Sequence, residues 1–418
     1  MVFLIDIVYL VLAIFYLPYL MVKGKWHNVY CVRFGFLDKD QVRRIQQRRN
    51  IWIHAVSVGE VLAVIGLIER IRKVYPNYSI VCSTVTKTGQ ALAKERLQQT
   101  AEVIYAPLDF SLVVRKFIHM IRPELFIAAE TEFWPNLYTL LHRNNVPVMI
   151  INGRISDSSF QGYQRFGFLT RPVLSKVRKF CMQSSLDAER VITLGARPEN
   201  VQVTGNIKFD APVVLEDSNG QKLNPDYTWL LAGSTHPGEE EVLIEVYQKL
   251  AQKHSNLRLV LVPRHIERSN DVCEILDSRQ LKAVLFSQLL PDEIRPEDVI
   301  VVDEIGRLRA LYQQADLVFV GKTLKVGGGQ NMIEPAQYGK PVFVGPLTDN
   351  FKDAMRLFLE KDAIVQVQDE KQLYQRMAEC LDHPDSVKRL AEAARQVTQE
   401  NRGVEEKTFQ AVAMCLKS

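Results

Sequence analysis

Short apolar runs alternate with longer stretches in which apolar residues recur at helical spacing along most of the chain. Each short run is typical of a buried strand, and each longer stretch predicts an amphipathic helix. The predicted strands cover residues 51–55, 78–83, 102–108, 123–129, 146–153 and 180–184 in the first half, and 229–232, 257–262, 299–302, 317–320 and 341–346 in the second. Strands that alternate with helices form parallel sheets, so the predicted fold class is α/β with two doubly wound, Rossmann-like sheets.

The two groups of strands are separated by Asp217–Asp226, a polar segment with asparagine, glycine and proline that indicates a linker. A chain of 418 residues also exceeds one ordinary hydrophobic core. We therefore predict an N-terminal Rossmann-like domain at residues 23–216 and a C-terminal Rossmann-like domain at residues 227–418.

The stretch Val2–Val22 precedes the first domain and is apolar except for interruptions at Asp6 and Pro18. A run of this length can just cross a bilayer, and the absence of a basic start and of a cleavage site disfavours a signal peptide. We predict a membrane-anchor helix at residues 1–22, and the cations that follow place the main body on the cytoplasmic side. Two alternatives stay open: a helix that lies in the membrane interface because of Asp6, and a buried helix of the first domain.

Net charge and the spacing of cysteines and histidines limit the kinds of partner and cofactor that we expect. The formal net charge of +4 is small for this length and no base-reading motif occurs, so no nucleic acid is expected as a partner. The six cysteines form no CxxC pair, and the eight histidines form no HxxxH or HExxH spacing. We expect no protein-bound metal and no cofactor, and we expect reduced thiols in a cytosol-facing protein.

The segment Ile51–Glu60 carries the first candidate for catalysis. A predicted strand enters a turn of small residues, and Glu60 stands where a helix is predicted to begin at Val61. This is the place where an open α/β sheet holds its chemistry. The helix dipole is expected to stabilise the carboxylate as an anion and to lower its proton affinity. The alternative is an ordinary first-turn acid without a catalytic role.

Three further charged residues follow strand ends. Glu130 and Glu132 follow the strand that ends at Ala129, and an extended chain would project both side chains alike. The alternative is that both acids only lie at the start of the next helix and have no catalytic role. Lys208 lies in the later stretch Val201–Asp210, within the motif TGNIKFD, on the loop that leaves the last strand of the first half. In a cleft it could stabilise a developing anion, whereas on the surface it would have no such role.

The second half contains two candidate phosphate sites. Residues 233–240, with the sequence GSTHPGEE, predict a phosphate-facing helix N-terminus. Residues 327–329 are consecutive glycines, which allow a ligand to approach backbone N–H groups closely. Asn331 and Glu334 are predicted one turn apart on the same helix face, where Glu334 could accept hydrogen bonds from ribose hydroxyls.

These motifs together resemble the Kdo transferases of lipopolysaccharide assembly, which have the glycosyltransferase B architecture. The resemblance extends from the N-terminal apolar run to about Asp353. It rests on the motifs IWIHAVSVGE, TKTG, AAETEFWPN, TGNIKFD, GSTHPGEE, PRH, FVG, GGGQNMIEP and GPLTDNFKD. It implies transfer of Kdo from CMP-Kdo to a glucosamine hydroxyl of a lipid A precursor (lipid IVA), with inversion and without a metal. The implied partners are CMP-Kdo, the lipid A precursor and the surface of the cell inner membrane, with the catalytic domains on the cytoplasmic side.

The resemblance also implies residue roles. Glu60 matches the general base, and Glu130 and Lys208 match residues that stabilise the transition state. The positions that match the CMP-binding segments are Pro263, Arg264, Ile305, Gly306, Arg307, Asn331, Met332, Ile333 and Glu334. The sequence departs from the common family pattern at Gln330, where histidine is usual, and at Arg307, where an acid is frequent.

Two other functions fit parts of the sequence. The second half alone would equally suit a fold-B glycosyltransferase that uses a uridine-linked sugar. The whole chain could also be a non-catalytic, membrane-tethered relative that binds a lipid or a nucleotide. The presence of Glu60, Glu130 and Lys208 together favours an enzyme.

Overall fold

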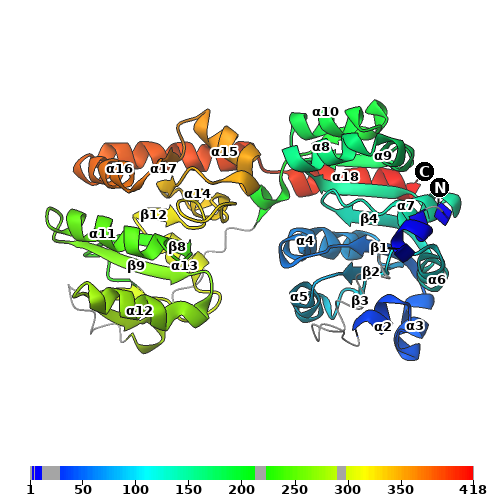
Figure 1. The fold of residues 1–418 in the computed structure, drawn as a ribbon, viewed down its shortest axis with the longest axis horizontal. Helices are drawn as coiled ribbons and strands as arrows, with labels where there is room; N and C mark the ends of the chain where they lie inside the picture. Colours follow the sequence, from blue (N-terminus) through cyan, green and yellow to red (C-terminus); the bar gives the residue numbers. More distant parts are fainter. Residues whose placement is uncertain (1, 4, 12–28, 212–222, 290–297, 418) are drawn as a thin grey trace. The chain divides into compact units, whose positions relative to one another are not determined.

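The computed structural model describes residues 2–3, 5–11, 29–211, 223–289 and 298–417. The chain divides into a first unit, Met1–Asp210 with Gly403–Ser418, and a second unit, Ala211–Arg402. Each unit is a parallel sheet with helices on both faces (Figure 1). This is the arrangement that the alternation of strand and helix patterns predicts.

The first unit has a seven-stranded sheet in the order β3-β2-β1-β4-β5-β6-β7. The strands are β1 (Arg49–His54), β2 (Tyr78–Thr84), β3 (Glu102–Tyr105), β4 (Pro123–Ala129), β5 (Val148–Gly153), β6 (Lys179–Met182) and β7 (Val201–Val203). All neighbours are parallel, and the strand order reverses between β1 and β4. Crevices at such reversal points, beyond the carboxyl ends of the strands, are where open α/β sheets bind ligands.

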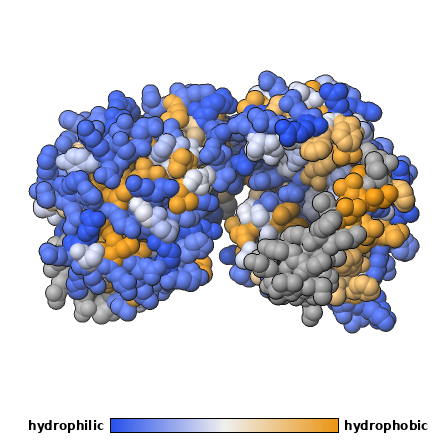
Figure 2. Space-filling model, viewed as in Figure 1, coloured by the Kyte–Doolittle hydropathy of each residue, from blue (hydrophilic) through white to orange (hydrophobic). Residues whose placement is uncertain are grey.

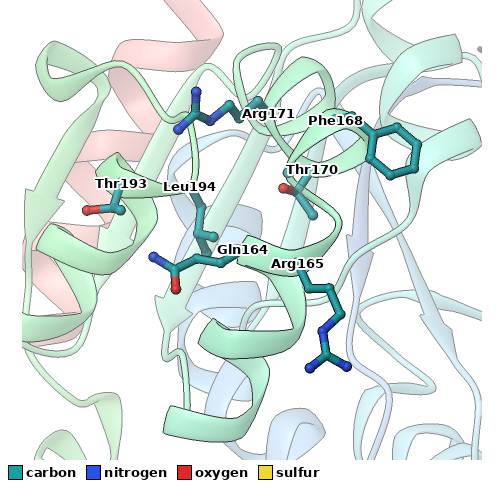
Figure 3. A pocket seen from close by; sticks show the side chains of 8 residues that line it. Gln164, Arg165, Phe168, Thr170, Arg171, Thr193 and Leu194 are labelled. Carbon is teal, nitrogen blue, oxygen red and sulfur yellow. The ribbon is translucent and has the colours of Figure 1, made fainter.

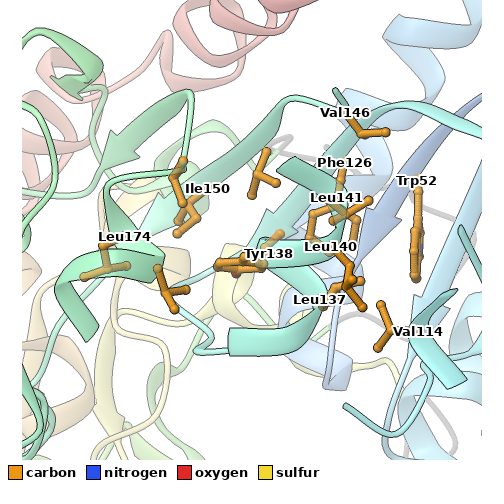
Figure 4. Close-up of a cluster of buried hydrophobic side chains, with 14 of the residues drawn as sticks. Trp52, Val114, Phe126, Leu137, Tyr138, Leu140, Leu141, Val146, Ile150 and Leu174 are labelled. Carbon is orange, nitrogen blue, oxygen red and sulfur yellow. The ribbon is translucent and has the colours of Figure 1, made fainter. Parts of the chain in front are cut away.

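Helices cover both faces of this sheet. They are α2 (Val29–Arg33), α3 (Lys39–Gln46), α4 (Val58–Val74), α5 (Lys87–Leu97), α6 (Ser111–Ile121), α7 (Pro135–Arg143), α8 (Asp157–Arg165), α9 (Gly167–Leu174), α10 (Ser185–Thr193) and α18 (Val404–Lys417). Alternate residues of β1 enter different cores: Trp52 packs with Phe126 and Tyr138 on one face (Figure 4), and Ile51 and Ile53 pack on the other. A central parallel strand is therefore apolar on both sides, which explains its continuous hydrophobic run.

The predicted second domain included residues 403–418, and the structure places these in the first unit instead. The Asp210 carboxylate accepts hydrogen bonds from the backbone N–H groups of Gly403, at 2.7 Å, and Glu405. Along α18, Phe409 and Val412 are buried in the core that contains Ile51 and Ile53. An amphipathic helix shows which of its faces is buried, but not which sheet buries it, so the boundary was missed.

The second unit also has a seven-stranded parallel sheet, in the order β10-β11-β9-β8-β12-β13-β14. Its strands are β8 (Thr228–Thr235), β9 (Leu257–Pro263), β10 (Lys282–Leu285), β11 (Asp298–Val301), β12 (Leu317–Val320), β13 (Val342–Val344) and β14 (Val365–Gln366). Its helices are α11 (Glu239–Ala251), α12 (Ser269–Ser278), α13 (Leu308–Gln314), α14 (Ile333–Gln337), α15 (Lys352–Leu359), α16 (Glu370–Asp382) and α17 (Pro384–Glu400). Here the order reverses between β8 and β12, which places a second binding edge at their carboxyl ends.

The N-terminal apolar run is described only in part. Residues 5–11 are helical, and Val2 and Ile5 are buried. Residues 12–22 of the predicted anchor lie outside the described residues. Within the part of the chain that the structure describes, no helix combines the length and the apolar character needed to cross a bilayer.

Candidate active site

Glu60 lies at the reversal point of the first sheet, directly after β1. The helix α4 begins at Val58 rather than at the predicted Val61, so Glu60 is in its first turn. The backbone N–H of Val56 donates to Glu60 Oε2 at 2.7 Å, and the Ser57 hydroxyl donates to Oε1 at 2.9 Å. Ser57 is the N-cap residue, yet its side chain binds the carboxylate instead of a helix N–H group. The two bonds fix the orientation of the Glu60 carboxylate.

Burial raises the pKa of Glu60 from 4.5 to about 7. The negative charges of Glu130 and Glu132 raise it further, whereas the hydrogen bonds from Val56 and Ser57 lower it. The prediction that the helix N-terminus would lower the proton affinity was therefore wrong. The Glu60 residue is only 7% exposed, and the loss of hydration outweighs the dipole in such a position.

Glu130 and Glu132 follow β4, the neighbour of β1 in the sheet. Glu130 has a φ angle of +62°, a left-handed conformation that is uncommon outside glycine, and its N–H donates to the Ile151 carbonyl at 2.8 Å. The expectation of an extended chain that projects both acids alike was thus wrong. Burial raises the pKa of Glu132, and the charge of Glu130 raises it further. The charges of Glu130 and Glu132 therefore act on Glu60, as expected for a site that tunes a base.

The loop after Glu130 is anchored at its far end by Asp109, a residue that the sequence analysis did not single out. The Asp109 carboxylate accepts the backbone N–H groups of Asn136, at 3.1 Å, and Leu137, at 2.8 Å, at the start of α7. The Tyr138 hydroxyl also donates to the Glu132 carbonyl at 2.8 Å. Burial raises the pKa of Asp109 to about 7. Its position at a strand end, after Pro107-Leu108, is the one signal in the sequence that could have indicated it.

Lys208 is in the 3-10 turn Ile207–Asp210, which follows the edge strand β7. The backbone N–H of Ile207 donates to Asn152 Oδ1 at 3.1 Å, and Asn152 is in β5. The segment after β7 therefore returns past β6 to β5, the neighbour of β4. Lys208 is half-buried and belongs to the same sheet edge as Glu60 and Glu130.

The predicted donor-binding residues of the second unit lie at or beyond the carboxyl ends of β9, β11 and β12, which belong to one sheet. Pro263 and Arg264 end β9, residues 305–307 follow β11, and residues 331–334 follow β12. Arg264 is exposed and is held by its backbone N–H, which donates to the Thr235 carbonyl at 3.0 Å. The three segments therefore lie along the carboxyl edge of one sheet, whose strand order reverses between β8 and β12.

The segment that follows β11 is open to solvent. Ile305 is 84% exposed, Gly306 has a φ angle of +90°, and Arg307 pairs with Glu304 at 2.6 Å. Arg307 thus has a charge partner from its own turn.

The glycine-rich segment 327–329 does not lead directly into a helix. Helix α14 begins at Ile333, so Asn331 precedes it, and Asn331 Oδ1 accepts the Ile333 N–H at 3.2 Å. The prediction that Asn331 and Glu334 share a helix face was wrong for this reason. Met332 and Ile333 are fully buried, so these two residues present no exposed surface to a ligand in this structure.

Glu334 pairs with Arg309, which the sequence analysis also missed. Arg309 lies in α13, and its Nη2 is 3.0 Å from Glu334 Oε1. Its Nε is 3.3 Å from the same oxygen. Both contacts are made by Oε1, and they fix the direction of the Glu334 carboxylate.

The predicted phosphate-facing turn at residues 233–240 holds a carboxylate of the protein itself. Glu239 Oε2 accepts the N–H groups of His236, at 3.0 Å, and Lys322, at 2.7 Å. Glu239 Oε1 accepts those of Thr323, at 2.9 Å, and Leu324, at 3.0 Å. This side chain is fully buried and joins the turn after β8 to the segment after β12. These N–H groups are thus committed to Glu239.

A separate cavity of about 490 Å³ lies among α8, α9 and α10 (Figure 3). It is lined by Gln164, Arg165, Gly167, Phe168, Thr170, Arg171, Thr193 and Leu194. None of the predicted site residues lines it. Among the described residues, no group of three or more His, Cys, Asp or Glu side chains could hold a metal ion.

The two parallel sheets give the chain the two-domain fold known as the glycosyltransferase B architecture. A solved glycosyltransferase from Rickettsia africae has a TM-score of 0.59 with this chain, at 15% identity, and the match covers 89% of this chain and 100% of that one. At this identity the likeness shows the fold alone.

The sequence comparisons identify the family. The profile of the family described as 3-deoxy-D-manno-octulosonic-acid transferase (kdotransferase) matches residues 30–211. The 3-deoxy-D-manno-octulosonic acid transferase of Haemophilus influenzae is 34% identical over 378 residues, which are 89% of this chain and 87% of that protein. The enzyme of the same name from Chlamydophila psittaci is 32% identical over 375 residues, 87% of this chain and 84% of that one. The chain belongs to the Kdo transferase family and is a glycosyltransferase.

Proposed function

We propose that this enzyme transfers Kdo from CMP-Kdo to a glucosamine hydroxyl of a lipid A precursor, lipid IVA, with inversion, in lipopolysaccharide biosynthesis. The observation that carries the proposal is the Glu60 carboxylate. It is buried, held by two hydrogen bonds, and has a pKa of about 7. Membership of the Kdo transferase family supplies the sugar and the class of reaction.

Glu60 acts as the general base in this proposal. A sugar hydroxyl is a poor nucleophile until a positioned group accepts its proton, and such a base contributes about 10²–10⁴ in rate. A carboxylate whose pKa is near neutrality is a stronger base than an ordinary one and is still partly ionised at pH 7. Its two hydrogen bonds leave room on each oxygen for the proton of the acceptor hydroxyl.

Other residues stabilise the charge that develops on the donor and on its leaving group. Lys208 and Glu130 stabilise the transition state, and Arg264 meets the phosphate of the cytidylate leaving group. Glu334, oriented by Arg309, accepts hydrogen bonds from the ribose hydroxyls. The proposal requires no metal, because the Arg264 guanidinium supplies positive charge to the leaving phosphate.

We also propose that the first unit sits on the cytoplasmic face of the inner membrane. Residues 5–11 form a helix whose outer face is apolar, with Leu10 58% exposed, and Leu112 of α6 is 77% exposed. Figure 2 shows apolar residues gathered on the first unit in the region where Figure 1 draws the N-terminus. An amphipathic helix of this kind binds at the headgroup level, where an amphiphilic acceptor presents its sugars.

The test is the mass of the product. Purified enzyme is incubated with detergent-dispersed lipid IVA and CMP-Kdo, and with uridine-linked sugars in parallel reactions. The expected result is a product heavier by one or more Kdo residues, formed only with CMP-Kdo and not by Glu60→Gln. Product with a uridine-linked sugar alone would establish the first alternative. Binding of CMP without any turnover would establish the non-catalytic one.

A further inference from the structure

We infer that the N-terminal helix is part of the catalytic apparatus as well as a membrane contact. In this inference, which deepens the proposed function, Asp6 and Tyr9 are positioning residues that hold the loop carrying Glu130 and Glu132. The observation is a set of hydrogen bonds between this helix and the first turns of α6 and α7.

Asp6 binds both of those helices. Its Oδ1 accepts the backbone N–H of Ser111, the first residue of α6, at 2.9 Å, and the Ser111 hydroxyl donates to its Oδ2. The same Oδ1 accepts the side-chain amide of Asn136, in the first turn of α7, at 2.9 Å. One carboxylate thus supplies acceptors that the first turns of helices otherwise lack, and it complements the positive end of the α6 dipole.

Tyr9 reinforces the contact one helical turn later. Its hydroxyl donates to Asp109 Oδ2 at 3.3 Å, and its ring packs edge-on against Phe110 with the ring centroids 5.8 Å apart. Asp109 is the residue that binds the N–H groups of Asn136 and Leu137. Asp6 and Tyr9 therefore hold the same cluster, Asp109, Ser111 and Asn136, which we call the α6–α7 polar cluster.

The α6–α7 polar cluster is the far anchor of the catalytic loop. The loop leaves the sheet at Glu130, whose N–H is bound by the Ile151 carbonyl, and it ends at Asn136, which is fully buried. Asn136 donates through its side chain to both Asp6 and the Asp109 carbonyl, the latter at 2.6 Å. A displacement of Asn136 is therefore transmitted to Glu130 and Glu132. Their charges act on the pKa of Glu60.

The pattern of exposure separates two faces of this helix. The inward positions, Val2, Ile5, Asp6 and Tyr9, follow the spacing of one helical face and are buried or half-buried. The outward positions that the structure describes are apolar and exposed: Phe3, Ile7, Val8, Leu10 and Val11. A helix that served only as an anchor would have no use for a carboxylate, which is costly in an apolar environment. Here the acid faces the protein and the apolar face is left for lipid, so binding to the membrane and ordering of the catalytic loop involve one element.

The experiment compares Asp6→Ala with Ile7→Ser, a matched change on the outward face, on detergent-dispersed lipid IVA. In detergent the membrane contact contributes nothing. We expect Asp6→Ala to lower kcat at least tenfold with the KM for CMP-Kdo within twofold of wild type, because a small misplacement of catalytic groups is costly. Ile7→Ser should keep kcat within twofold in detergent and lose binding to anionic lipid vesicles. Asp6→Asn retains Oδ1 as an acceptor and should recover kcat to within about threefold.

A second measurement does not depend on turnover. Hydrogen exchange of the amides of residues 130–140 should accelerate at least tenfold in Asp6→Ala, and less in Tyr9→Phe, with Ile7→Ser unchanged. Wild-type kcat and exchange in Asp6→Ala would overturn the inference, as would a loss of activity on vesicles that detergent restores completely. If wild-type enzyme makes no product from lipid IVA, the proposed substrate fails, and the exchange data alone decide whether Asp6 orders the loop. Should Asp6→Ala not fold, Tyr9→Phe, which removes one hydroxyl, decides in the same assays.

Discussion

Glu60 and Glu239 occupy similar places in the two units and are used differently. Each lies in the first turn of the helix that follows the strand at the reversal point of its sheet, β1 or β8. Glu239 accepts N–H groups at all of its good lone-pair positions and is fully buried. Glu60 accepts two hydrogen bonds from the described residues and lies near other acids. The number of hydrogen-bond donors around a carboxylate thus distinguishes two roles. Glu239, with four donors, is a structural clamp that joins two segments, whereas Glu60, with two, is a base that can take up a proton.

The largest expected effect tests the base. Glu60→Gln should lower kcat by about 10²–10⁴, because the amide cannot accept a proton, and should leave the affinity for CMP nearly unchanged. Single-turnover rates and calorimetric titration with CMP measure the two quantities. A variant that keeps more than about a tenth of the wild-type rate would rule out a general-base role.

The corresponding change at Glu239 should affect stability. Glu239→Gln replaces one acceptor oxygen by an amide donor that faces backbone N–H groups, and we expect the second unit to lose about 3 kcal/mol of stability. Urea denaturation measures the loss. Glu241→Gln, in the same helical turn, is the control; its Oε2 is buried without a hydrogen-bond partner, so the neutral side chain should cost little. Equal stability of the two variants would contradict the claim that the hydrogen bonds of Glu239 stabilise the second unit.

The sequence was sufficient for most of the fold, because strands buried on both faces leave long apolar runs between helical stripes. It also located Glu60 and Glu130 at strand ends, and the strand order then made them neighbours. The pKa of Glu60 could not be predicted, since burial depends on packing that no local pattern records. The α6–α7 polar cluster was missed for a related reason: Asp6 contacts Ser111, which is remote in sequence.

An intermediate effect is expected at the donor site. Glu334→Ala should weaken CMP binding by about 1–3 kcal/mol, because it removes a charged acceptor for the ribose hydroxyls. Calorimetry measures the affinity. Arg309→Ala keeps the acceptor and loses only its orientation, so it should cost less than Glu334→Ala. Unchanged affinity in Glu334→Ala would mean that Glu334 serves only to pair with Arg309. Its role would then be structural, like that of Glu239, which binds backbone N–H groups.

The smallest expected effect comes from removing one of the two hydrogen-bond donors to the Glu60 carboxylate. The Ser57 hydroxyl lowers the pKa of Glu60, so Ser57→Ala should raise that pKa by less than one unit. Since the base works only when ionised, kcat rises as pH rises through this pKa. The profile of the variant should therefore shift to higher pH, with a loss of about two- to fivefold at pH 7 and recovery at pH 9. Ser278→Ala, which removes a hydroxyl that donates to the Ile275 carbonyl within α12 of the second unit, is the control and should leave the profile in place. If the pH profile of Ser57→Ala coincides with that of wild type, the backbone N–H of Val56 alone is enough to set the pKa of Glu60.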